Sequence, residues 1–122
     1  MEITHRTLGD VIVLTPVGRI DYLAAADFER ALVPLLDPDS GSQRGLVIYL
    51  AGVDYISSVG LRVLMIATRA LRARGARIAA AALQPSVQEI FSVSRFDRVV
   101  ELFPTVQAAL SAISTSPPTR AA

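Results

Sequence analysis

Two adjacent serines, Ser57 and Ser58, follow an apolar run and stand at the start of a segment with helical periodicity. A serine hydroxyl in this place can cap the helix by accepting a hydrogen bond from a backbone N–H. Such a cap stabilises the folded protein by about 1 kcal/mol. The same place suits a phosphoserine, because a helix start tolerates the roughly −1.5 to −2 charges of a phosphate. Phosphorylation would then change the surface without unfolding the helix. On these residues alone, both capping and a reversible switch stay open.

The helix that follows carries two further kinds of candidate residue. Gly60 has no Cβ, so another backbone or a nucleotide can approach it closely. Alternatively, it is a small residue where helix and sheet touch. On a helical wheel Arg69 falls about 20° from Arg62, and Arg72 about 80° to the same side. The rest of the helix is almost entirely apolar. The spacing therefore predicts a narrow basic stripe, either solvated or in contact with a partner.

Several kinds of catalytic or ligand site lack the residues they need. The chain has no cysteine and a single histidine, His5, which we expect on the surface of a strand. A small serine hydrolase would need His5 as its base, and Ile56 stands where a nucleophile elbow needs glycine. A nucleotide-binding module would need a phosphate loop with lysine, and the chain has no lysine. Weak nucleotide contact at Gly60 stays open. We expect no catalytic residue, no metal and no cofactor.

Length and charge fit one small domain without a polyanionic partner. The chain has 122 residues, of which 52% are apolar, and 12 arginines against 11 acidic residues give a net charge of +1. This balance gives no electrostatic basis for binding nucleic acid or an anionic membrane. No uncharged stretch supplies the roughly 20 apolar residues of a membrane span, and no signal peptide is visible. We therefore expect a cytoplasmic monomer.

Strand and helix patterns alternate after an N-terminal hairpin, which predicts an α/β fold. Asp21 precedes the first helix, as an N-cap or an acidic residue near the helix start. The expected strands are Ile3–Leu8, Val11–Thr15, Leu46–Leu50, Arg77–Leu83 and a short one at Val99–Val100. The expected helices are Leu23–Leu36, Ser58–Arg74, Pro85–Val93 and Pro104–Ile113. We therefore predict a mixed sheet of four to five strands with about four helices packed on it.

Three stretches in this order resemble the STAS domain, and within it the bacterial anti-sigma factor antagonists. They are Gly18–Asp21 before the first helix, Tyr55–Leu61 around the serines, and Ser94–Val99 ahead of the last strand. The resemblance covers nearly the whole chain. It implies a single STAS domain over residues 1–113, with residues 114–122 as a flexible tail.

The resemblance also implies roles for individual residues. The family has Asp-Ser-Ser-Gly at the helix start and is phosphorylated on the first of these serines. Alignment on Ile56 and Gly60 places that serine at Ser58, while Ser57 replaces the aspartate and is the second choice. The implied partner-binding residues are Asp21, Ser57, Ser58, Val59, Gly60, Arg62 and Arg69.

The implied mechanism is partner switching. The unphosphorylated protein binds an anti-sigma factor that is also a Ser/Thr kinase, and phosphorylation of Ser58 releases it. A PP2C-type phosphatase resets the switch, so the protein is a substrate and not an enzyme. The alternative is a constitutive STAS adaptor subunit of another regulatory or lipid-transport complex, which would need no phosphorylation.

Overall fold

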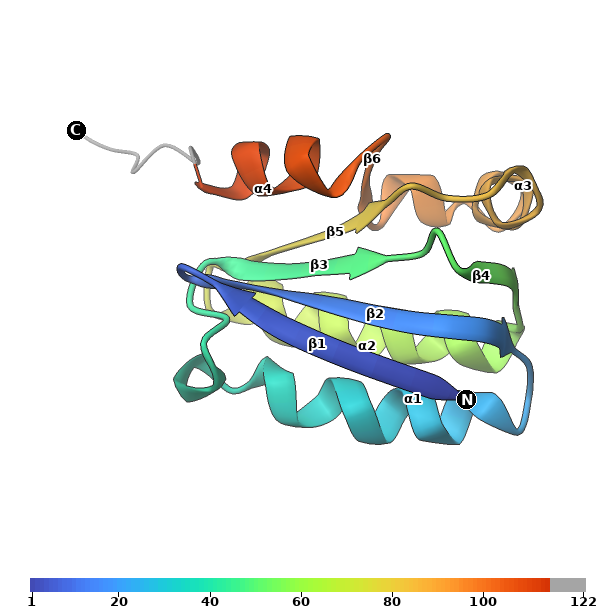
Figure 1. The fold of residues 1–122 in the computed structure, drawn as a ribbon, viewed down its shortest axis with the longest axis horizontal. Coiled ribbons are helices and arrows are strands. Elements are labelled where there is room, and N and C mark those ends of the chain that lie inside the picture. The colour runs from blue at the N-terminus through green and yellow to red at the C-terminus, as the bar shows by residue number, and fades with distance from the viewer. Residues whose placement is uncertain (115–122) are drawn as a thin grey trace.

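The computed structural model describes residues 1–114 and confirms the predicted mixed α/β architecture (Figure 1). The strands are β1 (Glu2–Leu8), β2 (Val11–Ile20), β3 (Gly45–Tyr49), β4 (Val53–Ile56), β5 (Arg77–Ala81) and β6 (Glu101–Phe103). The α-helices are α1 (Ala24–Leu32), α2 (Ser58–Ala73), α3 (Pro85–Val93) and α4 (Val106–Ser114). Three 3₁₀ helices complete the fold: η1 (Val33–Leu36), η2 (Pro38–Ser40) and η3 (Phe96–Arg98).

The sheet has the order β1-β2-β3-β5-β6, with β1 antiparallel to β2 and the remaining pairs parallel. β2 is long enough to pair twice, through residues 11–14 with β3 and through residues 18–20 with β4. Helices α1 and α2 lie on one face of the sheet and α4 on the other, while α3 lies near β4 (Figure 1). The end of β4 thus delivers the chain directly to the first turn of α2.

Several predicted boundaries are wrong. β2 continues five residues beyond Thr15 because the short strand β4 supplies it with a second neighbour. Strand β4, which contains the polar Asp54, was not predicted from the sequence. The last strand is Glu101–Phe103 and not Val99–Val100, whose N–H groups both donate to the Phe96 carbonyl in a 3₁₀ turn.

The helix ends also differ from the prediction. The helix predicted to reach Leu36 ends as the 3₁₀ helix η1, which contains Pro34. The last helix begins at Val106 and not at Pro104, and the Thr105 side chain accepts a hydrogen bond from the Ala108 N–H. Ser114, predicted to begin a flexible tail, is the last residue of α4, and the rest of that tail lies outside the described residues.

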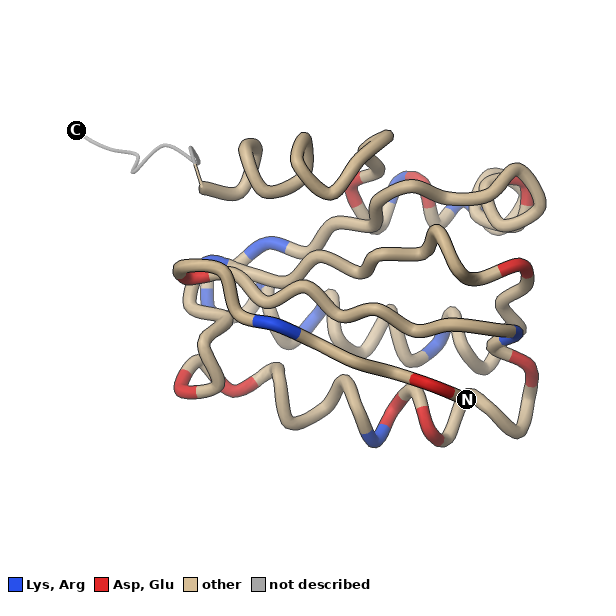
Figure 2. Tube along the Cα trace, in the orientation of Figure 1, with Lys and Arg blue, Asp and Glu red and all other residues tan. Residues whose placement is uncertain are grey.

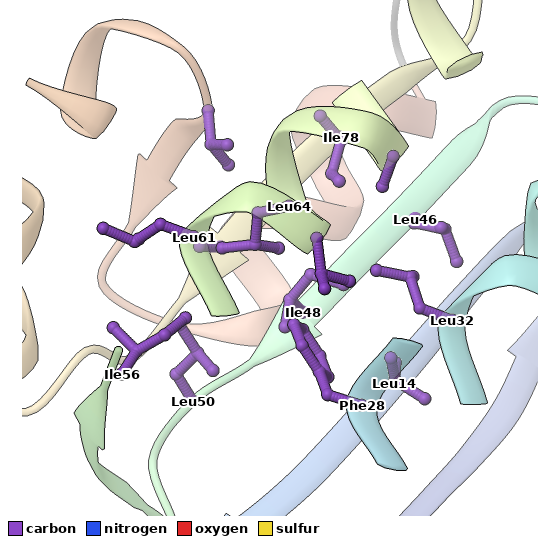
Figure 3. Packing of buried hydrophobic residues seen from close by; sticks show 14 of the residues in the cluster. Leu14, Phe28, Leu32, Leu46, Ile48, Leu50, Ile56, Leu61, Leu64 and Ile78 are labelled. Carbon is purple, nitrogen blue, oxygen red and sulfur yellow. The ribbon is translucent and has the colours of Figure 1, made fainter. Parts of the chain in front are cut away.

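The main hydrophobic core lies between the sheet and helices α1 and α2 (Figure 3). Leu14 and Ile48 come from the sheet, Phe28 and Leu32 from α1, and Leu64 from α2, and all five are fully buried. Each such side chain contributes about 1.5–3 kcal/mol through burial. A smaller cluster between the sheet and α4 uses the alternate strand positions. Two-sided burial of the central strands fixes the sheet on which α2 rests.

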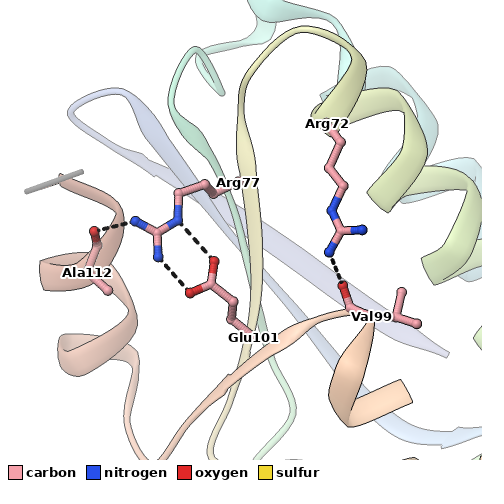
Figure 4. A network of polar contacts seen from close by, with 5 residues as sticks. All are labelled: Arg72, Arg77, Val99, Glu101 and Ala112. Carbon is pink, nitrogen blue, oxygen red and sulfur yellow. Dashed lines mark hydrogen bonds and ion pairs between the residues drawn. The ribbon is translucent and has the colours of Figure 1, made fainter. Parts of the chain in front are cut away.

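Basic side chains join neighbouring elements of the fold through hydrogen bonds and an ion pair. Arg77 donates to both carboxylate oxygens of Glu101 (3.0 and 2.6 Å) and to the Ala112 carbonyl (2.8 Å), which ties β5 to β6 and α4 (Figure 4). The hydrogen bonds to Glu101 raise the pKa of Arg77 above its ordinary value. Arg72 donates to the Val99 carbonyl at 2.8 Å. Arg72 is therefore engaged within the fold, and the predicted basic stripe is shorter than expected.

The end of α2 is held by Arg74. Its guanidinium makes five hydrogen bonds, two to the Leu36 carbonyl, two to the carbonyl and hydroxyl of Ser42, and one to the Gln43 carbonyl. Ser42 is fully buried and donates its own hydroxyl to the Leu35 carbonyl at 2.6 Å. These contacts join the end of α2 to the segment between η1 and β3. Within residues 1–114 no helix combines the length and the apolar character needed to cross a bilayer.

Candidate functional site

Ser57 is the N-cap of α2 and is committed to that role. Its backbone is extended, its Oγ accepts from the Gly60 N–H at 3.2 Å, and its own N–H donates to the Ile20 carbonyl at 2.8 Å. Only 8% of the residue is exposed. The structure therefore gives Ser57 the capping role that the sequence left open between the two serines. Burial and the cap hydrogen bond both disfavour Ser57 as a phosphate acceptor, its second-choice role.

Ser58 is the first residue of α2 and has the opposite surroundings. It is exposed, and its hydroxyl makes no hydrogen bond with any residue of the described part of the chain. The hydroxyl is thus available to an incoming reagent, and a group attached to it breaks no contact of the fold. Of the two adjacent serines, Ser57 is therefore a buried cap and Ser58 is exposed and makes no hydrogen bond through its hydroxyl within residues 1–114.

Gly60 lies where helix and sheet touch, one of the two roles that the sequence left open. The residue is buried, and a Cβ on it would lie 2.7 Å from Cγ1 of Ile56 and 2.9 Å from Cγ2 of Ile20. These distances are shorter than side chains tolerate, so the position needs glycine for packing. Gly60 thus brings α2 close to the ends of β2 and β4, as the helix–sheet alternative expects.

Asp21 is half-buried and positions the start of α1. Its side chain accepts from the Ala24 N–H at 2.9 Å, and its carbonyl accepts from the Ala25 N–H at 2.9 Å. These bonds confirm the predicted role of Asp21 at the helix start. The turn that they close leaves Tyr22 and Leu23 strongly exposed, at 73% and 79%. Nothing in the periodicity of the sequence marked these two residues as exposed.

Two surface hollows flank the start of α2. The first, of about 250 Å³, lies against α1 and is lined by Tyr22, Leu23, Ala25, Ala26, Glu29 and Val59. The second, of about 390 Å³, lies between α2, β4 and α3. Ser58 and Leu61 line this second hollow together with Glu89, Ile90 and Val93 of α3. Val93 is 79% exposed. Ser58 and Val59 therefore stand between two largely apolar depressions.

The predicted basic residues Arg62 and Arg69 are both exposed on α2. Neither makes a hydrogen bond or an ion pair with residues 1–114, whereas Arg72 and Arg74 on the same helix do. Figure 2 shows basic positions along α2 and a mixture of acidic and basic positions along α1. Exposed, unengaged arginines on this helix are available to acidic groups of a partner.

The described residues hold no group of three or more His, Cys, Asp or Glu arranged to bind a metal ion. The single histidine, His5, is exposed on the edge strand β1, opposite Leu14 of β2, and makes no hydrogen bond to either serine. The Ser58 hydroxyl is thus accessible, and among residues 1–114 it is not hydrogen-bonded to a histidine or a carboxylate. Such a hydroxyl suits a substrate of another enzyme better than a nucleophile.

Comparison with known proteins finds one family. The family model described as the STAS domain matches residues 2–109. BtrV of Bordetella bronchiseptica, named as a candidate anti-sigma factor antagonist, is 28% identical over 118 residues, covering 97% of this chain and 99% of BtrV.

Solved structures agree with this match at the level of the fold. The crystal structure of an anti-sigma factor antagonist from Mycobacterium paratuberculosis has a TM-score of 0.80 and 24% identity, covering 93% of each chain. The phosphorylated form of the Bacillus cell fate determinant SpoIIAA has a TM-score of 0.68 and 14% identity, covering 92% of this chain and 99% of SpoIIAA. At these identities the two structures show that the fold is shared.

Proposed function

Because the chain belongs to the STAS domain family, we propose that it is an anti-sigma factor antagonist that works by partner switching. The observation that carries the proposal is the exposed, unengaged hydroxyl of Ser58 beside the buried capping hydroxyl of Ser57. The match to BtrV along nearly its whole length supports the same function.

In this proposal the unphosphorylated protein binds an anti-sigma factor that is also a Ser/Thr kinase. The kinase transfers the γ-phosphoryl group of ATP to Oγ of Ser58, so that one O–P bond forms, the bond to ADP breaks, and the hydroxyl proton passes to the kinase. A PP2C-type phosphatase hydrolyses the phosphoserine. The protein itself is a substrate and not an enzyme. Because the proposed kinase uses ATP, we propose that the protein acts in the cytoplasm and is a monomer in the free state.

The division of labour between the two serines supports a reversible switch. Ser57 supplies the cap, so phosphorylation of Ser58 costs α2 no hydrogen bond. The added negative charge falls on the first residue of a helix, where it is tolerated. The folded state therefore survives phosphorylation, and the change is confined to the surface that a partner would contact.

The proposed partner surface combines apolar and basic side chains around Ser58. Tyr22 and Leu23, which the sequence reasoning missed, share the first hollow with Val59. Arg62 and Arg69 extend the surface along α2. Asp21 shapes it from the adjacent turn, while Ser57 and Gly60 support it from below. Tyrosine and arginine are among the residue types that most often dominate binding energy at protein interfaces.

A phosphate in the middle of such a surface weakens binding because a dianion must be buried against apolar groups. Each 1.4 kcal/mol of this penalty lowers the affinity about tenfold. Burial of an unpaired charge costs several times that amount, so the phosphate need only be partly covered to release the partner.

The test compares Ser58→Ala with Ser58→Asp. The Ser58→Ala protein serves as bait in a lysate of its own cells with ATP present, and the captured kinase is then purified and titrated calorimetrically. We expect Ser58→Ala to bind as tightly as the wild type and to stay bound when ATP is added. Ser58→Asp is expected to bind at least about tenfold more weakly.

Thr7→Asp, which adds the same charge on the exposed edge strand β1, is the matched control and is expected to bind like the wild type. Equal affinity of all three variants would contradict partner switching. That result would instead support a constitutive STAS adaptor, in which Ser58 has no regulatory role.

A further inference from the structure

Arg62 lies one helical turn after Ser58 on the same side of α2. Residues four apart on a helix are neighbours, with about 5–6 Å between their Cβ atoms, so oppositely charged side chains there pair directly. Both residues are exposed, and the Arg62 guanidinium has no hydrogen bond or ion pair with residues 1–114. A charge placed on Ser58 would therefore meet an unengaged arginine without any rearrangement of the fold.

The other charged groups around Ser58 do not offer the same pairing. Glu89 of α3 lines the hollow that contains Ser58, and Asp54 of β4 is exposed nearby in sequence, so both would repel a phosphate. Asp21 and Glu29 are acidic groups on the α1 side. Arg19 lies over the ring of Tyr55, 4.3 Å from its centre. Arg95 follows Ser94, which lines the hollow from the end of α3.

Arg69 provides an internal comparison. It shares the exposed, unengaged character of Arg62, but it lies eleven residues after Ser58, about 16 Å along the helix axis. At that separation solvent and salt screen most of the interaction between two exposed charges. The two arginines therefore differ mainly in their distance from Ser58.

We propose that Arg62 is the counter-ion of a phosphate on Ser58, and that this pairing withdraws Arg62 from the partner. The proposal rests on the proposed function in that Ser58 receives the phosphate. In the unphosphorylated protein Arg62 is free to bind a carboxylate of the partner. In the phosphorylated protein the same guanidinium is held within α2 by a charge-assisted pair. Release then has two causes, the added charge and the loss of an attractive one.

The test uses protein with phosphoserine installed at position 58 during translation, which needs no kinase. The protonation of the phosphate is followed by ³¹P NMR over the pH range of its second ionisation. Pairing with Arg62 favours the dianion, so Arg62→Gln is expected to strengthen proton binding by the phosphate about twofold. Arg62→Lys should keep part of the effect, and Arg69→Gln should titrate like the wild type.

Either of two results would overturn the proposal. One is an unchanged titration in Arg62→Gln. The other is a change of equal size in Arg69→Gln or Arg95→Gln, which would indicate a general field and not a specific pair. Because the phosphate is installed, the titration is independent of whether cells phosphorylate Ser58. Failure of the pairing and failure of the proposed function are thus separate results.

Discussion

The two ends of α2 have opposite characters. At the C-terminal end Arg74 makes five hydrogen bonds to carbonyl and hydroxyl groups of the segment that leads into β3. At the N-terminal end the Ser58 hydroxyl and the Arg62 guanidinium make none with the described residues. Tyr22 and Leu23 are also largely exposed beside that end.

This difference separates groups that maintain the fold from groups that are available for binding. The helix itself packs along its whole length, so its exposed N-terminal end is not a consequence of poor folding. Ser57 and Gly60 hold that end from inside, through a cap hydrogen bond and close packing. A surface built on such a fixed base can change its charge without changing its shape.

The largest expected effect on stability comes from the C-terminal end of α2. Arg74→Ala should lower the free energy of unfolding by about 2–3 kcal/mol, because the carbonyls of Leu36 and Ser42 lose a charged donor. Chemical denaturation followed by circular dichroism measures the change. Arg62→Ala, the matched substitution near the other end, should stay within about 0.5 kcal/mol of the wild type. Equal losses would remove the contrast between the two ends.

A smaller loss is expected from the packed interior of the N-terminal end. Gly60→Ala places a methyl group against Ile56 and Ile20, and we expect it to destabilise the protein by about 1–2 kcal/mol. Helix propensity alone predicts the opposite sign, a gain of up to about 1 kcal/mol. The sign of the change in unfolding free energy, again from denaturation curves, therefore distinguishes packing from propensity. A gain in stability would mean that α2 does not closely approach β2 and β4.

The smallest effects test the division between the two serines. Ser57→Ala should cost about 1 kcal/mol of unfolding free energy because the Gly60 N–H loses its acceptor. Ser58→Ala should change it by less than about 0.5 kcal/mol. Calorimetric melting of the two variants measures the difference. If Ser58→Ala proved the more damaging of the two, the assignment of cap and free hydroxyl would be reversed.

The sequence predicted the parts of the fold that depend on strong local signals. Pro85–Val93 was predicted with both ends correct, because proline favours the first turn of a helix. The apolar helix at Ser58 was placed to within one residue at its end, where Gly75 stops it. By contrast β4 was missed. Its four residues include Asp54, and the strand exists because β2 offers a free edge that no local pattern reveals.

Motifs in the sequence predicted which residues belong to the site, but their packing and exposure depend on the fold. Motif order located the two serines and Asp21, and the capping bond of Asp21 was confirmed. The role of Gly60 stayed open because a missing side chain indicates close approach without saying to what, and only the fold identifies Ile20 and Ile56. Tyr22 and Leu23 were missed because their exposure depends on the turn that Asp21 closes.

Partner switching requires that Ser58 is modified in the cell. Intact-mass and site-mapping mass spectrometry on protein isolated from its own cells, at several growth conditions, tests this. We predict a fraction heavier by one phosphate, with the phosphate mapped to Ser58. Phosphate on Ser57 would contradict the assignment of the two serines. No phosphate under any condition would contradict partner switching and leave a constitutive adaptor as the function.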